Sequence, residues 1–226
     1  MKLDFTALFC QIDDFCQSFQ PSLHQSLLKQ RSRRSRKRAS GFSMSEMMCI
    51  VIGFHQARFR DFKAYYLLFS SQLKAFFPSL MSDSRFVQLM LRLWLPLTAF
   101  ALNAKGACTG TSFVDSTSME VCKVKRIKRN KVFRGIAQQG KMTKGWFYGF
   151  ELHLVINECG EILAFQLTPR NVDGRKPLKN LCQTMWGKLF GDKGYISAKL
   201  AGELLQKGVQ LITSVRNNMK NRLMEL

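Results

Sequence analysis

Acidic residues and histidine are scarce in this sequence of 226 residues. It contains 15 Asp and Glu against 35 Lys and Arg, which gives a formal net charge of +20, and it has three His. An imbalance of this size predicts a polyanionic partner, and nucleic acid is the leading class. Hydrophobic residues make up 46% of the chain, which suffices for a core and excludes a disordered tail.

Paired cysteine motifs are also absent. The seven cysteines are scattered, no two of them form a Cys-x-x-Cys pair, and no histidine lies near them at metal-ligand spacing. This pattern argues against a structural zinc site. The start of the chain lacks the charged and then apolar form of a signal peptide, so we expect reduced thiols and a cytoplasmic protein.

One apolar stretch, from Phe86 to Ala104, has nearly the length of a membrane span. Arg92 and Pro96 lie within it, and a central arginine is costly in a bilayer. Basic segments on both sides of the stretch also disagree with a membrane anchor. We therefore expect a kinked, buried helix and no membrane partner.

The first half of the chain has the pattern of helices. Apolar residues recur at helical spacing from Phe5, and Pro21 is expected to end that helix. Ser43 and Glu46 have the spacing of a capping box before a buried apolar helix over residues 47–54.

Another helix is expected over residues 61–76, and it ends before Pro78. Its aromatic side chains could stack on bases, but their helical spacing favours packing in a core. We assign residues 1–107 to a helical N-terminal domain with a DNA-binding or accessory role.

The second half has the pattern of a mixed α/β fold. Expected elements are strands over 112–116, 147–157 and 162–168, a helix over 178–185, a strand over 188–191, a helix from Ser197 to Gly208 and a strand over 209–215. Three antiparallel strands followed by helix, strand, helix and strand describe a ribonuclease-H-like sheet. In the second strand we expect apolar side chains from Tyr148 to Ile156 on one face, with Glu151 and His153 on the other.

Two aspartates, Asp115 and Asp192, each end an expected strand. Side chains at strand ends leave the core and converge on ligands, so the two acids could share one metal site. Carboxylates suit Mg²⁺ or Mn²⁺, and two such ions clamp an in-line displacement at phosphorus. Each acid taken alone could instead cap a turn, since Gly191 to Gly194 has turn composition.

Basic residues concentrate in two short runs. The first comprises Arg31, Arg33, Arg34, Arg36, Lys37 and Arg38, and the second comprises Lys123, Lys125, Arg126, Lys128, Arg129 and Lys131. A solvated loop is the alternative interpretation of each run. The net charge favours phosphate contact for the first run. The second run follows the Asp115 strand and is expected beside the acids, which favours DNA contact there.

Several motifs of the second half occur together, and in this order, in one known family. They are Phe113 to Thr117, Lys131 to Phe133, Gly145 to Phe150, Leu152 to Asn157, Asn171 to Asp173 and Gly191 to Tyr195. With these motifs the chain resembles the DDE transposases of bacterial insertion sequences, specifically the nine-eight-two family.

That resemblance implies that Asp115 and Asp192 are the first two catalytic acids and metal ligands. It implies two Mg²⁺ or Mn²⁺ ions in the intact enzyme, and cleavage and joining of DNA by a homo-oligomer at the bacterial nucleoid. Lys193, beside Asp192, is assigned to DNA binding together with the two basic runs.

The chain departs from that family in three respects. Glu151 stands where the family has a basic residue, and Gly174 stands where it has a second acid. The family's third catalytic acid lies on a later helix, whereas this chain ends at Leu226 with Glu225 as the available substitute. The resemblance therefore implies a truncated chain of little or no activity, in which the third acid is unknown.

Taken together, the sequence predicts a DNA transposase with an incomplete ribonuclease-H-like catalytic domain at residues 108–226. Two alternatives stay open. One is a DNA-binding remnant without catalysis, and the other is a non-specific metal-dependent nuclease.

Overall fold

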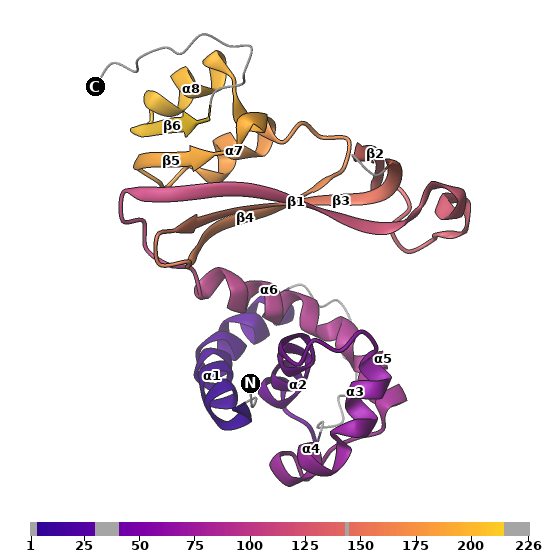
Figure 1. Cartoon of the computed structure of the whole chain (residues 1–226). Helices are drawn as coiled ribbons and strands as arrows, with labels where there is room; N and C mark the ends of the chain where they lie inside the picture. The colour runs from indigo at the N-terminus through magenta and orange to yellow at the C-terminus, as the bar shows by residue number, and fades with distance from the viewer. Residues whose placement is uncertain (1–3, 30–40, 143–144, 215–226) are drawn as a thin grey trace. The chain divides into compact units, whose positions relative to one another are not determined.

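The structure, a computed structural model, describes residues 4–29, 41–142 and 145–214. The chain divides into two compact units, Met1–Asn103 and Ala104–Leu226 (Figure 1). Each unit has its own hydrophobic core.

The first unit is helical. Its elements are α1 (Phe5–Lys29), α2 (Met44–Gln56), α3 (Phe62–Leu68), α4 (Ser70–Phe76), α5 (Asp83–Met90), the 3-10 turn η1 (Leu91–Leu93) and α6 (Trp94–Asn103). The predicted capping box forms at the start of α2, where the Ser43 hydroxyl accepts from the Glu46 amide at 3.1 Å and the Glu46 carboxylate accepts from the Ser43 amide at 2.6 Å. Helix α2 is buried as expected, and the predicted aromatic core includes Tyr65 and Tyr66.

Two predicted helix boundaries in this unit are wrong. Pro21 lies inside α1, which continues to Lys29. A proline inside a helix removes one backbone hydrogen bond, which weakens or kinks the helix without having to end it, and Ile12 and Cys16 fix the turns before Pro21 in the core. The helix expected over residues 61–76 is interrupted at Phe69, where φ is −92° and ψ is 7°.

The apolar stretch over residues 83–103 is helical and is interrupted by η1. It is the single helix among the described residues that is long and apolar enough to cross a membrane by length and composition, and 22% of its most apolar window is buried. The expectation of a buried helix is therefore wrong for most of its surface. One stripe faces the core: Phe86, Leu89, Leu93 and Pro96 are buried, and Leu97 and Phe100 pack partly buried against it, while the opposite side is exposed.

The second unit is built on a six-stranded mixed sheet. Its strands are β1 (Thr111–Lys123), β2 (Gln138–Met142), β3 (Gly145–Asn157), β4 (Ile162–Pro169), β5 (Gly187–Gly191) and β6 (Val209–Thr213). Strand β1 pairs antiparallel with β3, and β3 pairs antiparallel with both β2 and β4. Strands β5 and β6 continue the sheet from β1 in parallel. This order confirms the ribonuclease-H-like fold; the short strand β2 was not predicted.

Helical segments complete this unit. They are the 3-10 helix η2 (Val124–Arg129), α7 (Arg175–Leu181), the 3-10 turn η3 (Lys193–Tyr195) and α8 (Ala198–Leu205). Ser197 caps α8 as predicted, since its hydroxyl accepts from the Leu200 amide at 3.3 Å. Helices α7 and α8 share one core with the sheet, so they cover one of its faces.

The covered face of β3 is not the one that the sequence pattern indicated. Glu151, His153 and Val155 are buried, whereas Leu152 and Leu154 on the opposite face are partly exposed. Burial of the two polar side chains is possible because both have hydrogen-bond partners in the unit. The alternation was therefore correct, but the assignment of the buried face was wrong.

Candidate functional site

Asp115 and Asp192 occupy matching positions on two neighbouring parallel strands. The pairing of β1 with β5 ends where Val114 lies opposite Gly191, so each aspartate follows the last paired residue. The backbone at Asp192 is still extended, with φ −74° and ψ 176°. Adjacent strands lie about 4.8 Å apart, and residues at matching positions point to the same face. The register therefore places the backbones of Asp115 and Asp192 side by side, with both side chains on the same face of the sheet.

Asp115 does not end its own strand, contrary to the sequence-based expectation. Strand β1 continues to Lys123, because β3 goes on pairing with it on the other edge. What ends at Asp115 is the pairing with β5. From Asp115 onward, β1 pairs with β3 but no longer with β5. Asp115 is thus the first residue of β1 beyond its pairing with β5.

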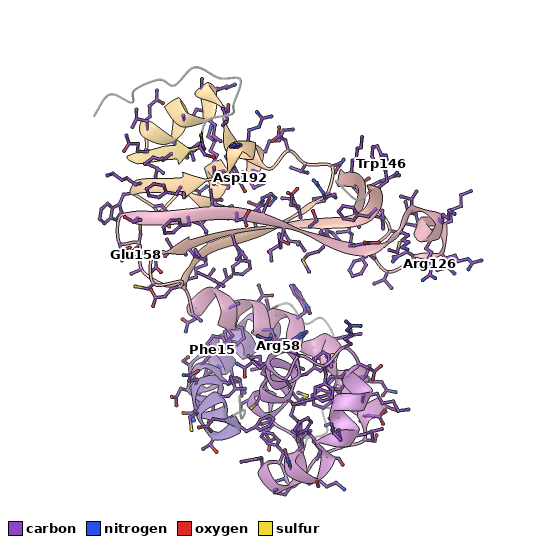
Figure 2. The ribbon with its side chains drawn as sticks, viewed as in Figure 1. Phe15, Arg58, Arg126, Trp146, Glu158 and Asp192 are labelled. Atoms are coloured by element: carbon purple, nitrogen blue, oxygen red, sulfur yellow. The ribbon has the colours of Figure 1, made fainter. Side chains whose placement is uncertain are left out.

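The face that carries the two acids is the one that α7 and α8 leave uncovered. Phe113 and Phe190, each two residues before one of the acids, stack there with ring centroids 5.5 Å apart. Both aspartates are exposed (Figure 2 labels Asp192). Their carboxylates are therefore accessible to solvent and to a ligand approaching this face.

Backbone hydrogen bonds orient each carboxylate. The Asp115 carboxylate accepts from the Ser116 amide at 2.7 Å, and the Asp192 carboxylate accepts from the Gly194 amide at 2.9 Å. The second bond makes Asp192 the cap of η3, so the turn-capping role that its sequence context indicated is present. Each bond engages one carboxylate oxygen, and a carboxylate has further lone pairs with which to bind a cation.

Two carboxylates with access to water fit one hard divalent cation that keeps several water ligands. The described residues contain no group of three or more His, Cys, Asp or Glu that could hold a metal ion. Glu225, the sequence-based candidate for a third acid, lies outside the described residues, as does the basic run from Arg31 to Arg38.

A buried polar network lies on the opposite, covered face beside Asp115. Ser116 donates its hydroxyl to one Glu151 oxygen at 2.9 Å, and Arg170 donates to the other at 2.9 Å. Arg170 also lies over the Phe147 ring, 5.7 Å from its centroid. The network ties the residue after Asp115 to the end of β4. Sequence analysis missed it, although it flagged Glu151 as unusual.

Two further side chains of this face have shifted pKa values. Burial raises the pKa of Tyr195, and the carboxylates of Asp192 and Asp115 raise it further, so its phenol stays protonated beside the acids. Burial lowers the pKa of His153, whose Nε2 lies 3.0 Å from the Thr168 hydroxyl. Neither side chain carries charge at neutral pH.

The second basic run does not lie beside the acids, which corrects the sequence-based expectation. Strand β1 runs eight residues from Asp115 to Lys123, which is about 26 Å at the usual rise of a strand. Lys193 is the predicted basic residue that stays near the acids, since it directly follows Asp192, and it is exposed.

The run is also more ordered than a solvated loop. It forms η2, whose Ile127 packs against a buried cluster that includes Tyr148 and Phe150. All six predicted cations of the run are exposed: Lys123, Lys125, Arg126, Lys128, Arg129 and Lys131. The antiparallel pair of β1 and β3 thus presents a fixed cluster of positive charge at the end that is remote from Asp115 and Asp192.

An open groove of about 950 Å³ lies at this end, lined in part by Lys123, Lys125, Arg126 and Trp146. Figure 2 labels Arg126 and Trp146 there. Glu120 is the acidic residue of the lining. Trp146 was part of a sequence motif but was not assigned a role.

One family model matches the chain. The family model described as "Transposase DDE domain" matches residues 105–226. No curated protein sequence matches the chain.

Two solved structures are similar. A piggyBac transposase synaptic complex with hairpin DNA has 14% sequence identity and a TM-score of 0.47, and the match covers 96% of this chain and 50% of that one. A Mos1 transposase paired-end complex with the left transposon end has 9% identity and a TM-score of 0.29, with 88% and 66% covered. The chain thus spans half the length of the first protein and 66% of the second.

Proposed function

The chain belongs to the DDE transposase family, and we propose that it is a DNA transposase whose second unit carries out metal-dependent cleavage and transfer of DNA strands. The observation that supports this proposal most directly is the register of β1 and β5. It sets Asp115 and Asp192 at matching positions on an exposed face. Two carboxylates so placed are suited to a cation that binds phosphate oxygens.

In this proposal Asp115 and Asp192 hold Mg²⁺ or Mn²⁺. A cation bound there supplies activation of a water or a three-prime hydroxyl and stabilisation of the leaving oxygen. The Ser116 and Gly194 amides fix the two carboxylates, and Lys193 contacts a phosphate beside them. The Glu151 network lies on the covered face of the sheet and orients β1 through its hydrogen bond with Ser116.

The finer assignments follow from the sequence motifs. We assign the chain to the nine-eight-two family of bacterial insertion sequences, acting as a homo-oligomer on element ends in the cytoplasm. The helical unit serves as a DNA-binding or accessory domain. The third acidic ligand stays unassigned.

Metal binding tests the proposal directly. We expect Mn²⁺ titration, followed by calorimetry or paramagnetic resonance, to show a site that Asp115→Asn and Asp192→Asn each weaken at least tenfold. Asp173→Asn is the matched control, because Asp173 is exposed in the same unit but pairs with Arg175. Equal Mn²⁺ affinity in wild type and both site variants would contradict the shared site.

Phosphate contact by η2 has its own test. Replacing Lys125, Arg126, Lys128 and Arg129 by alanine is expected to weaken duplex binding and to reduce the slope of log affinity against log salt by about 3 to 4, if each side chain neutralises one phosphate. An unchanged slope would remove η2 from the DNA interface.

A second candidate function is DNA binding without strand cleavage. It is favoured by the donor set, since the described residues supply two carboxylates and no third ligand. A cleavage assay on DNA with the element's ends and Mn²⁺ separates the two functions. Nicked products that Asp115→Asn abolishes indicate the transposase, whereas metal-independent binding without products indicates the second candidate.

A further inference from the structure

The groove at the end of β1 and β3 combines an exposed aromatic ring with cations, and this combination has a use beyond phosphate contact. Trp146 is 58% exposed although it lies in a strand. Lys123, Lys125 and Arg126 line the same groove, against the single acid Glu120. The local charge is therefore positive around an accessible indole.

Neighbouring aromatic residues show that the exposure of Trp146 is not general to this region. Tyr148 and Phe150 are buried in the cluster beneath η2, and Phe147 is buried under the Arg170 guanidinium. Each of these rings has a packing role in the unit.

Trp186 provides a second comparison. It is 57% exposed, yet its ring packs on Gly110, where an added Cβ would lie 2.7 Å from the indole. At Gly145, the residue before Trp146, an added Cβ would meet no atom within 4 Å. Trp146 lines the groove and has more than half of its surface exposed.

Resting on the proposed function, we propose that this groove binds an unpaired nucleotide of DNA, whose base stacks on Trp146 while Lys123, Lys125 and Arg126 hold the adjoining phosphates. An aromatic side chain stacks most readily on a base that has left the duplex, because the faces of paired bases inside a duplex are already covered by their neighbours. Exposed lysine and arginine alone would serve equally for paired DNA. The indole is therefore the feature that selects unpaired DNA.

Gln139 supports this assignment. It lies on β2, lines the groove, and offers an amide that both donates and accepts hydrogen bonds. Lys141 on the same strand is the direct cross-strand partner of Trp146, which adds positive charge beside the ring. A nucleotide in the groove would thus meet a stacking surface, an edge contact and cations.

Binding of two matched DNA duplexes tests the inference. They have one sequence and length, but one duplex carries a single unpaired nucleotide, and affinities are measured by fluorescence anisotropy at one salt concentration. Wild type is expected to prefer the duplex with the unpaired nucleotide. Trp146→Ala should reduce that preference by roughly 5- to 150-fold, the range for loss of one base–aromatic stack, whereas Trp146→Phe retains most of it.

The controls separate stacking from folding and from general DNA binding. Trp94→Ala removes another exposed tryptophan, in the first unit, and should leave the preference unchanged. Trp146→Ala should bind the fully paired duplex like wild type, which also shows that it is folded. In a chain with Trp94→Phe and Trp186→Phe, the remaining Trp146 fluorescence should be quenched by the unpaired nucleotide alone.

Two results would overturn the inference. One is a wild-type chain that binds both duplexes equally, and the other is a Trp146→Ala variant that keeps the full preference. Failure of the DNA binding that the proposed function requires gives a different result, since the chain would then bind neither duplex in a salt-dependent way, whereas loss of strand cleavage alone would leave the preference between the duplexes intact.

Discussion

Replacing Glu151 by glutamine tests whether the polar network beside Asp115 stabilises the strand that carries it. The Glu151 side chain is 11% exposed, and that of its partner Arg170 is 21% exposed. Glutamine keeps the shape of the side chain and one acceptor oxygen, so Ser116 retains a possible partner. It removes the negative charge, which leaves the Arg170 guanidinium largely buried without its anion.

The size of the effect follows from this partial burial. A hydrogen bond to a charged group contributes about 1.5–3 kcal/mol, and loss of one partner of a fully buried ion pair costs about 3–5 kcal/mol. Because solvent reaches both side chains, we expect the free energy of unfolding to fall by about 2 kcal/mol. Arg170→Gln should have a similar effect, and the double variant should lose less than the sum, with a coupling of about 1–2 kcal/mol.

Urea unfolding measures this effect in the second unit. In a Trp94→Phe background, fluorescence comes from Trp146 and Trp186, which both lie in that unit. Glu151→Gln should lower the midpoint at an unchanged slope.

The exposed pair of Asp173 and Arg175 is the control, and its disruption should cost less than about 1 kcal/mol. A Glu151→Gln variant within about 0.5 kcal/mol of wild type, the range of a neutral surface substitution, would refute a stabilising network. Strict additivity with Arg170→Gln would also refute it.

Three further predictions concern the same unit. Gly187→Ala should prevent stable folding, because φ is +86° there and a Cβ would overlap the Gly110 carbonyl oxygen. Gly202→Ala, in open space on α8, should instead raise the thermal midpoint, since the free energy of unfolding rises by up to about 1 kcal/mol. Leu189→Ala, at a fully buried position, should lower the free energy of unfolding by about 2–5 kcal/mol in urea titrations. Burial holds the pKa of His153 below 6.5, its ordinary value, so the unfolded chain binds this proton at a higher pH than the folded chain does. The free energy of unfolding should therefore fall as the pH drops below 6.5. His153→Gln should flatten that pH dependence in unfolding curves.

Local signals in the sequence predicted much of the fold. The capping residues Ser43 and Ser197 start helices at the expected places, since a cap depends on backbone amides within three residues. The strand order also followed from pattern, because three alternating strands followed by helix and strand units allow few arrangements. Both kinds of signal act over short separations in the chain.

Features that depend on distant contacts were missed or misplaced. The 3-10 helix η2 lies within the second basic run, which has no apolar alternation, and β2 follows that run. Ile127 holds η2 against the cluster of Tyr148 and Phe150. The buried face of β3 was misassigned because the partners of buried Glu151 are distant in sequence: Arg170 is 19 residues away and Ser116 is 35 residues away. None of these contacts can be read from a periodic pattern.

The candidate site shows the same division. Two aspartates after expected strands were visible in the sequence, and the β1–β5 register sets them side by side, although their catalytic role stays a prediction. The distance to the second basic run was misjudged, because the sequence pattern ended β1 at Ser116 whereas β3 extends it to Lys123. Strand length was thus decided by the partner strand.

The length of β1 has a consequence for how DNA would lie on this unit. Asp115 and the groove at Lys123 are about 26 Å apart along the strand, and one base pair of duplex rises about 3.4 Å, so roughly eight base pairs separate the two places. An unpaired nucleotide at Trp146 would therefore be remote from any phosphate at the two acids. The cations of η2 and the indole would fix the register of the DNA, while Asp115 and Asp192 act on a bond about three quarters of a helical turn away.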